Sequence, residues 1–315
     1  MWGIYDATGF LERLRAPGLR GQPLNMWSKL DGLAGRLSGN TDKLAVRFWG
    51  VRGSIACAGP ETLKYGGNTS CVEVMFGERR VILDAGSGLR YLGETLKCDE
   101  TLETDIFLSH SHMDHVCGLP FFAPLSCPTS RIRLWSGHLE NGWTTAKAID
   151  ELMTEPLFPV SKDVVFKAHV EFVDFQAGDT LNPATNVTVR TAPLNHPNGA
   201  TGYRFEYGGK SLCYVTDTEH VPGKPDQKIL DLIEDADIFI YDCSYTDEEY
   251  KKCVGYGHST WQEGMRLAKA ANVKQFVVFH HDPSHDDAAM DKIARELKNE
   301  LPNAVVAQEG MVLKP

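Results

Sequence analysis

The run FLSHSHMDHVCGLPFF at residues 107–122 constrains this chain more than any other feature of its sequence. Its first residues are apolar and predict a strand, and the turn that follows carries His110, His112, Asp114 and His115. Side chains alternate along an extended segment, so His110 and His112 point to one side. Asp114 and His115 follow where the chain bends towards a helix. The spacing therefore predicts two adjacent metal positions at the end of a strand.

Three later segments offer the further ligands that a two-metal site needs. His196 follows VTVRTAPLN, Asp217 follows KSLCYVT and His280 follows KQFVVF, so each lies where a predicted strand ends. Strand ends on a rigid scaffold are a usual place for functional residues. We expect one metal at His110, His112 and His196, and the other at Asp114, His115 and His280, with Asp217 bridging the two.

The donor set indicates which metals would bind. Imidazole and carboxylate ligands without a thiolate suit two divalent ions, most readily Zn²⁺, with Mn²⁺ or Fe²⁺ as alternatives. The competing interpretation is a group of histidines satisfied by hydrogen bonds at the start of a helix. Three histidines and an aspartate within six positions, directly after a strand, make that interpretation the weaker one.

The composition of the chain limits its possible binding partners and the cellular compartment in which it is expected. The net charge of −10 and the absence of any run of five Lys or Arg residues disfavour long nucleic acid as a partner. No stretch of 18 apolar residues predicts a membrane span, and the N-terminal residues do not follow the pattern of a signal peptide. The eight cysteines contain no C-x-x-C pair, so we expect reduced thiols in the cytoplasm rather than a disulfide framework.

The apolar runs divide the chain into two parts. Residues 1–42 are expected to form a partly helical N-terminal extension, in which five apolar residues recur at helical spacing: Met26, Trp27, Leu30, Leu33 and Leu37. This helix could pack on the main domain or on a second subunit, which leaves a homodimer open. Residues 43–315 carry strand-like runs in both halves with helices between them, which predicts a two-sheet sandwich flanked by helices.

The ligand pattern resembles that of the metallo-β-lactamase-fold hydrolases. The resemblance rests on the H-x-H-x-D-H run and covers about residues 44–315. It implies an α+β fold, an αββα sandwich of two mixed β-sheets flanked by helices, with hydrolysis at a pair of metal ions. His112 stands where the di-iron flavoprotein branch would carry Glu, so the resemblance favours the hydrolytic branches.

A second motif narrows the branch. GHSTWQEG at residues 257–264 is similar to the His-Ser-Thr motif of the phosphodiesterase branch, which includes tRNA 3′-end endonucleases and phosphoribosyl cyclic phosphodiesterases. By the same resemblance, IFIYDCSY supplies Asp242 as the partner of His258, and KQFVVFHHDP aligns His280, not His281, as the last ligand. Nothing in the chain matches the basic Gly/Pro-rich arm of the tRNA-processing enzymes, so bulky RNA is disfavoured.

Phosphodiester hydrolysis explains a histidine outside the ligand set. The reaction needs a nucleophile, stabilisation of charge on phosphorus and a proton for the leaving alkoxide. A hydroxide that bridges the metals, oriented or deprotonated by Asp114, would meet the first two needs. His258, held by Asp242, would supply the proton. The alternative is a histidine that caps a helix or is buried with a hydrogen bond, but the Asp242 and His-Ser-Thr context favours catalysis.

The sequence therefore predicts a two-metal phosphodiesterase that hydrolyses a small diester, such as a cyclic nucleotide or a cyclic phosphate. Hydrolysis of a carbon ester, lactone or thioester at the same metals is the alternative. A non-catalytic binding module is less favoured, because all seven ligands are intact. The natural substrate stays open.

Residues outside the ligand set complete the predicted site. The expected substrate contacts are Arg52, Asn68, Phe158, Ser259 and His285, with Phe158 in a TEPLFPVS loop that resembles a lid. Thr260 and Glu263 have the spacing of a capping box, so helix initiation would also explain that segment.

Three remaining residues receive structural interpretations. Asp84 is expected to shape a turn beside the site, and His138 and His169 are expected to be structural or exposed.

Overall fold

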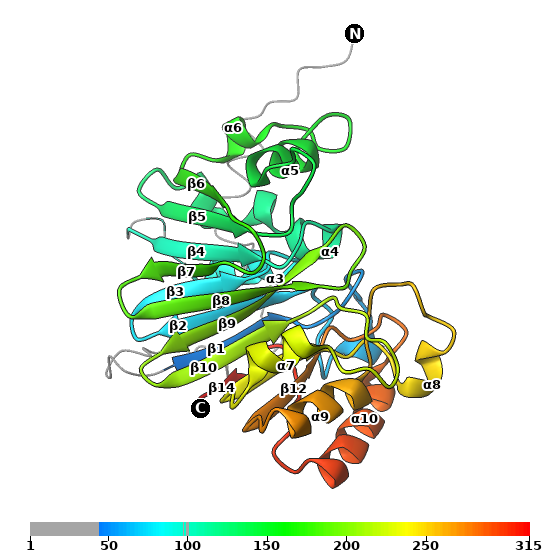
Figure 1. Ribbon diagram of the computed structural model, residues 1–315. Helices are drawn as coiled ribbons and strands as arrows, with labels where there is room; N and C mark the ends of the chain where they lie inside the picture. The colour runs from blue at the N-terminus through cyan, green and yellow to red at the C-terminus, as the bar shows by residue number, and fades with distance from the viewer. Residues whose placement is uncertain (1–43, 97, 99–100) are drawn as a thin grey trace.

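The computed structural model describes residues 44–96, 98 and 101–315. The predicted extension at residues 1–42 lies outside the described residues. The described chain forms two stacked sheets with helices on both outer faces (Figure 1). The predicted sandwich of two mixed sheets flanked by helices is confirmed.

The first sheet has seven strands and mixed pairing. In spatial order its strands are β14 (Val312–Leu313), β1 (Leu44–Gly50), β2 (Cys71–Phe76), β3 (Arg79–Leu83), β4 (Glu103–Leu108), β5 (Arg131–Ser136) and β6 (His169–Asp174). The pairs from β14 to β3 are antiparallel, and those from β3 to β6 are parallel.

The second sheet repeats this plan. In spatial order its strands are β13 (Val305–Val306), β12 (Gln275–Phe279), β11 (Ile238–Asp242), β10 (Lys210–Val215), β9 (Ala200–Tyr207), β8 (Val187–Leu194) and β7 (Thr180–Ala184). The pairs from β13 to β10 are parallel, and those from β10 to β7 are antiparallel.

Helices cover the outer face of each sheet. Those on the side of the first sheet are α3 (Gly88–Glu94), α4 (Met113–Val116), α5 (Thr145–Leu152) and α6 (Lys162–Val165). Those on the side of the second sheet are α7 (Gln227–Ile233), α8 (Asp247–Tyr250), α9 (Trp261–Ala270) and α10 (Asp287–Glu300). Three 3₁₀ turns complete the described elements: η1 (Pro60–Thr62), η2 (Leu119–Phe121) and η3 (Ala123–Ser126). Figure 1 shows α7, α9 and α10 gathered at the bottom of the view.

Alternation along the strands explains the three apolar layers. Phe107 of β4 faces the second sheet and packs with Phe205 of β9, whereas Ile106 and Leu108 face the helices and pack with Leu89 of α3. Strands buried on both faces read as nearly continuous apolar runs. The runs seen in the sequence are therefore the strands of the core.

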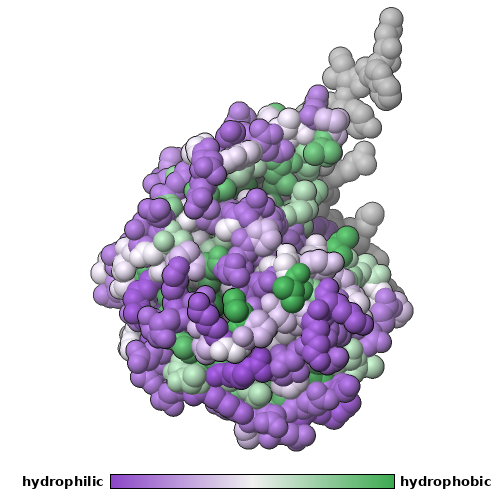
Figure 2. Space-filling view, turned by 45° about the vertical axis from the view of Figure 1, so that its right-hand side comes forward, coloured by the Kyte–Doolittle hydropathy of each residue, from purple (hydrophilic) through white to green (hydrophobic). Residues whose placement is uncertain are grey.

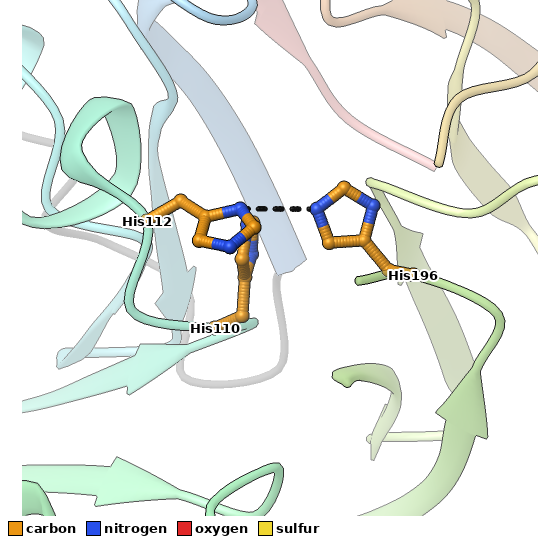
Figure 3. Close-up of side chains that lie close together, drawn as sticks. All are labelled: His110, His112 and His196. Atoms are coloured by element: carbon orange, nitrogen blue, oxygen red, sulfur yellow. Dashed lines mark hydrogen bonds between the residues drawn. The ribbon is translucent and has the colours of Figure 1, made fainter. Parts of the chain in front are cut away.

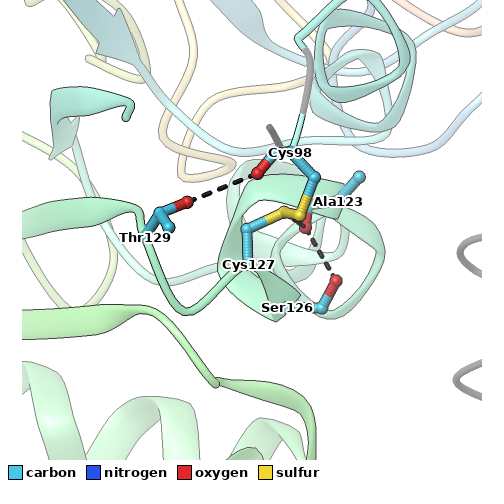
Figure 4. The surroundings of a disulfide bond; sticks show 5 residues. All are labelled: Cys98, Ala123, Ser126, Cys127 and Thr129. Carbon is cyan, nitrogen blue, oxygen red and sulfur yellow. Dashed lines mark hydrogen bonds between the residues drawn. A yellow bond between two sulfur atoms is a disulfide. The ribbon is translucent and has the colours of Figure 1, made fainter. Parts of the chain in front are cut away.

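The cysteines differ from expectation at one pair. Cys98 and Cys127 form a disulfide with 5.6 Å between their Cα atoms, so the expectation of reduced thiols throughout is wrong here (Figure 4). The two residues are 29 positions apart, and the turn after α3 meets the end of η3 only through the fold. The other cysteines are free thiols: Cys57, Cys71, Cys117, Cys213, Cys243 and Cys253.

No helix among the described residues reaches the length and apolarity that crossing a bilayer requires. The longest described helix, α10, has 14 residues, whereas a membrane span needs about 20.

A buried carboxylate in the middle of β4 gives a test of the core. Asp105 is fully buried and accepts hydrogen bonds from Arg79, from Arg133 at 2.6 Å and from Trp135 at 2.9 Å. Asp105→Ala should lower the free energy of unfolding by about 3 kcal/mol, because it leaves charges without their partner. We place the loss at the low end of the usual range because both arginines are partly exposed and can be hydrated.

Denaturant unfolding would measure this loss, with Asp163→Ala as the matched control. Asp163 is an exposed carboxylate paired with Lys162, and such pairs contribute about 0–1 kcal/mol. Equal losses in the two variants would contradict the structural role of Asp105.

Candidate metal centre

The seven predicted ligands meet at one edge of the sandwich. β8 and β10 both pair antiparallel with β9, and β10, β11 and β12 are parallel, so these four strands end at the same edge. β8 leads into His196, β10 into Asp217 and β12 into His280. The end of β4 brings the cluster at residues 110–115 to meet them.

Three imidazoles form the first group. The ligand atoms of His110, His112 and His196 lie within 4.8 Å of one another. His112 Nδ1 is 3.1 Å from His196 Nε2, and Figure 3 shows these two rings facing each other with His110 close to His112. Three neutral imidazole nitrogens at this spacing can face a single divalent cation.

Four residues form the second group, Asp114, His115, Asp217 and His280, and all are buried. His115 Nε2 lies 3.1 Å from Asp114 Oδ2 and 3.2 Å from Asp217 Oδ2. His280 Nε2 lies 3.4 Å and 3.3 Å from the same two oxygens. Two carboxylate oxygens and two ring nitrogens thus surround one point.

Asp217 lies between the two groups. Its Oδ2 faces His115 and His280, and its Oδ1 is 3.8 Å from His110 Nε2 and 3.9 Å from His196 Nε2. One oxygen therefore faces each group, which is the geometry expected of a bridging carboxylate.

The residues present fit a pair of cations. Nε2 of His110, His115 and His280 is buried and makes no well-aligned hydrogen bond with a described residue, although carboxylate oxygens of Asp114 or Asp217 lie 3.1–3.8 Å away. Buried polar atoms of this kind are costly and rare in native proteins. Divalent cations would satisfy all three nitrogens at once.

The opposite ring nitrogen of each of the five histidines has a fixed partner. The pairs are His110 Nδ1 with Ser109 Oγ (3.1 Å), His112 Nε2 with Asn198 Oδ1 (3.2 Å), His115 Nδ1 with Asp84 Oδ2 (2.8 Å), His196 Nδ1 with the Gly257 carbonyl (2.8 Å) and His280 Nδ1 with Ser244 Oγ (3.1 Å). Such partners orient metal-binding imidazoles and select the nitrogen that faces the metal.

Asp84 contributes more than the turn that the sequence predicts. It is fully buried, holds His115, and accepts hydrogen bonds from the Ser109 hydroxyl at 2.8 Å and the Tyr214 hydroxyl at 2.7 Å. Its position directly after strand β3 is the sequence signal that could have identified it, because the other site residues also follow strands.

Backbone strain gathers at the same edge. Asp84, Asp217 and His280 have φ values of 58°, 57° and 61°, in the left-handed region that residues other than glycine seldom adopt. Strain of this kind persists where surrounding structure enforces it, often at functional sites.

Electrostatics keep the carboxylates ionised. Burial would raise the pKa of Asp217, but the charges of His115, His280 and His110 outweigh it and hold this pKa well below its usual value. Burial would lower the pKa of His115, yet Asp217, Asp114 and Asp84 outweigh burial and raise that pKa. Ionised carboxylates are the form in which Asp binds a metal.

His258 lies beside the ligand cluster with Asp242 as its partner. The His258 Nδ1 is 3.0 Å from Asp242 Oδ2, and Asp242 also accepts from the Ser244 hydroxyl and the Thr218 amide. Burial lowers the pKa of His258, but the charge and the hydrogen bond of Asp242 outweigh it and raise that pKa to about 9.

The choice between His280 and His281 follows from their directions. His281 is fully buried on another side, where its Nε2 is 2.9 Å from the Ala307 carbonyl. Burial lowers the pKa of His281 to about 3, so its ring stays neutral. Only His280 belongs to the cluster.

Arg52 occupies a position that does not fit its predicted role. It is fully buried, and its guanidinium donates to the carbonyls of Gly66 at 2.8 Å, His285 at 2.6 Å and Asp282 at 3.1 Å. The guanidinium joins its own segment to the loop of Gly66 and to the loop that holds Asp282 and His285, and this corrects the prediction that Arg52 contacts an anionic substrate.

The other predicted substrate contacts also have structural partners. Asn68 binds Glu309 and Ser87, and the fully buried Ser259 lies between His220 and Tyr241. His285 is buried against Glu249, and the ring of Phe158 packs on Phe121. None of the four lines the large cavity beside the cluster.

That cavity is the feature that sequence reasoning missed. It has a volume of about 690 Å³ and lies between His112 and α5, and we call it the α5 cavity. Its wall includes His138, which is buried with its Nε2 3.1 Å from Ser111 Oγ. Trp143 and Asn198 also line it. His138 is therefore structural, as expected, but it also lines a cavity next to the site. No motif in the sequence marks these residues.

The contact between Asp84 and His115 gives a test of the cluster. Asp84→Asn should weaken metal binding by about 10–100-fold, because the amide supports the His115 ring less well than a carboxylate does. Competition with a chromophoric chelator measures the affinity. Asp174→Asn is the control, since Asp174 accepts from Thr145 away from the cluster. Unchanged affinity in Asp84→Asn would show that Asp84 serves only the fold.

Comparison with known proteins agrees with this geometry. The family model described as Beta-lactamase superfamily domain matches residues 79–281. The chain is 22% identical over 303 residues to Ribonuclease Z of Clostridioides difficile, covering 78% of this chain and 92% of that protein. The residues matched by the family model include the H-x-H-x-D-H run.

Solved structures share the architecture. A diphosphatase from the PhnP family has a TM-score of 0.64 and 18% identity, over 87% of this chain and 97% of that chain. Zn²⁺-bound PqqB from Methylobacterium extorquens has a TM-score of 0.62 and 17% identity, over 85% and 99%. At these identities the likeness shows the fold. The chain belongs to the β-lactamase superfamily, and it is a metal-dependent hydrolase with the metallo-β-lactamase fold.

Proposed function

We propose that this hydrolase is a two-metal phosphodiesterase that acts on a small phosphodiester. The observation that carries the proposal is the pair of His258 and Asp242, 3.0 Å apart, directly beside the seven-ligand cluster. A cluster of ligands alone would suit many hydrolyses. A histidine outside the ligand set, held by a buried carboxylate, adds a proton donor that a leaving alkoxide needs.

The ligand assignment follows the two groups. His110, His112 and His196 would hold one divalent ion, and Asp114, His115 and His280 the other, with Asp217 between them. When bound, the two ions supply Lewis-acid stabilisation of the phosphate charge and lower the pKa of water. Nitrogen and carboxylate donors without a thiolate support Zn²⁺, and Mn²⁺ and Fe²⁺ suit the same donors.

His258 would hold the proton for the leaving oxygen on its Nε2. Its Nδ1–H donates to Asp242, which leaves Nε2 as the nitrogen for substrate. The charge and the hydrogen bond of Asp242 raise the pKa of His258, which favours the protonated ring that a proton donor requires. Asp242 cannot turn away from this pair, because Ser244 and Thr218 donate to its two oxygens.

Asp114 would position the attacking water. Its Oδ2 accepts a hydrogen bond from the Ser54 amide at 2.8 Å, which fixes the carboxylate at the centre of the second group. From that place it can accept a proton from water as phosphorus is attacked.

We also propose that the substrate is a small diester rather than RNA. The name Ribonuclease Z, carried by the C. difficile relative, points to RNA and is partly at odds with a small substrate. A net charge of −10 and a cavity of about 690 Å³ beside the cluster support a small diester.

A panel of substrates separates the candidates. The metal-loaded protein should hydrolyse bis(p-nitrophenyl) phosphate and small cyclic diesters, because its metals and His258 act on any accessible phosphodiester. Cleavage confined to RNA would overturn the small substrate. Activity confined to lactones or thioesters would overturn the phosphodiesterase.

His258→Ala tests the proton donor. We expect the variant to keep its fold and its metals, because His258 is not among the seven ligands. Its rate should fall by about 10²–10⁴-fold on diesters with an alkoxide leaving group, the range for general acid catalysis. The loss should be much smaller on p-nitrophenyl diesters, since nitrophenolate leaves without a proton. Steady-state rates on paired substrates measure the difference.

The control is His196→Ala, which removes a proposed ligand. It should lose metal and activity on both kinds of diester. If His258→Ala lost activity equally on both, or released metal, His258 would be a positioning residue or a ligand rather than the acid.

A further inference from the structure

The α5 cavity shares a wall with the metal cluster. His112 belongs to both, and its Nε2 is 3.2 Å from Oδ1 of Asn198, which also lines the cavity. Ser111, between two ligands in the sequence, lines it too. A substrate whose phosphate lies at the cluster would therefore reach the cavity with its next group. The volume of about 690 Å³ lies within the range of small-molecule sites.

Trp143 gives the cavity an aromatic wall. It is 43% exposed, whereas the other described tryptophans, Trp49, Trp135 and Trp261, are at most 8% exposed. An exposed indole beside a cavity offers a rigid, flat contact surface at low conformational entropy. Lys147 Nζ lies 4.3 Å from the centre of this ring and holds it from the side of α5.

The charges in the cavity disfavour a second phosphate. Glu140 and Glu151 line it, and neither makes an ion pair with a described residue. Carboxylates repel an anion and accept hydrogen bonds from N–H groups. Asn141 and Asn198 add further polar contacts. The group that enters is therefore uncharged and carries donors at its edge.

Apolar side chains form the remaining wall. Met113, Val116, Ile149 and Leu152 line the cavity, so its occupant also has an apolar face. An acyl chain would bury the carboxylates and amides without partners, which is costly. Figure 2 shows hydrophobic residues in separate patches on a largely hydrophilic face of the molecule.

A flat group with apolar faces and a polar edge meets all of these conditions. We propose that the α5 cavity binds the nucleobase of a nucleotide diester, with Trp143 as its stacking surface. The inference rests on the proposed function, because the phosphate of the same substrate lies at the metal cluster. The substrate class becomes nucleotides rather than sugar phosphates or lipid diesters.

Two diesters with the same leaving group test the inference in the metal-loaded protein. One is p-nitrophenyl thymidine 5′-phosphate, and the other is methyl p-nitrophenyl phosphate, which has no base. Trp143→Ala should lower kcat/KM for the thymidine diester by about 10-fold or more, mainly through KM, since base stacking on an aromatic residue contributes about 1–3 kcal/mol. The methyl diester should be hydrolysed as by the unaltered protein.

Matched variants separate stacking from general damage. Trp143→Phe keeps an aromatic face and should retain most of the preference for the thymidine diester. Leu63→Ala removes an apolar side chain that is 65% exposed and does not line the cavity, and it should leave both rates unchanged. Equal losses on both diesters in Trp143→Ala, or no loss on either, would overturn the inference. So would an unaltered protein that hydrolyses only the methyl diester.

A binding measurement keeps the two proposals apart. If the metal-loaded protein hydrolysed neither diester, the proposed function would fail. Calorimetric titration with adenosine 5′-monophosphate would then test, independently of hydrolysis, whether the cavity binds a nucleobase. Binding that weakens in Trp143→Ala and persists in Trp143→Phe supports a nucleobase site, and binding that is absent or equal in all variants overturns it.

Discussion

The structure depends on a cluster of buried histidines and carboxylates that face one another at one edge of the sandwich. Nε2 of His110, His115 and His280 makes no well-aligned hydrogen bond with a described residue, and Asp114 and Asp217 are buried against them. Such groups destabilise a fold unless something compensates them. The Nδ1 atom of each of these histidines has a hydrogen-bond partner, which fixes the ring so that its Nε2 points into the cluster. Two divalent cations are the compensation that this geometry fits.

The sandwich makes this concentration of charge possible. Its apolar layers anchor strands that end at one edge, and five site residues lie one or two positions past those ends: Asp84, His110, His196, Asp217 and His280. Three of these positions, Asp84, Asp217 and His280, adopt left-handed backbone conformations. The packed apolar core around the site holds these residues in their strained conformations, because its own packing does not depend on them. The same edge bears the His258 and Asp242 pair and the α5 cavity, so metals, proton donor and cavity lie together.

Part of this arrangement was predictable from the sequence, and the reasons are physical. Ligands such as His110 and His112 stand close together after an apolar run, and His196, Asp217 and His280 follow strands, so local pattern alone identified them. Arg52 shows the limit: nothing local tells that its guanidinium is buried among three carbonyls. The Cys98–Cys127 disulfide and the α5 cavity depend likewise on contacts between distant segments. Long-range packing decides such features, and a single sequence does not reveal it.

The central claim is that the seven-ligand cluster binds two metal ions and that hydrolysis of a phosphodiester depends on both. Its most direct test is to strip the protein of metal and titrate Zn²⁺ or Mn²⁺ back while following bound metal and hydrolysis of bis(p-nitrophenyl) phosphate together. We expect activity to be absent without metal and to reach its plateau at about two equivalents per chain, the number that a two-metal site takes. Binding of less than about one equivalent, or full activity in the stripped protein, would contradict the account.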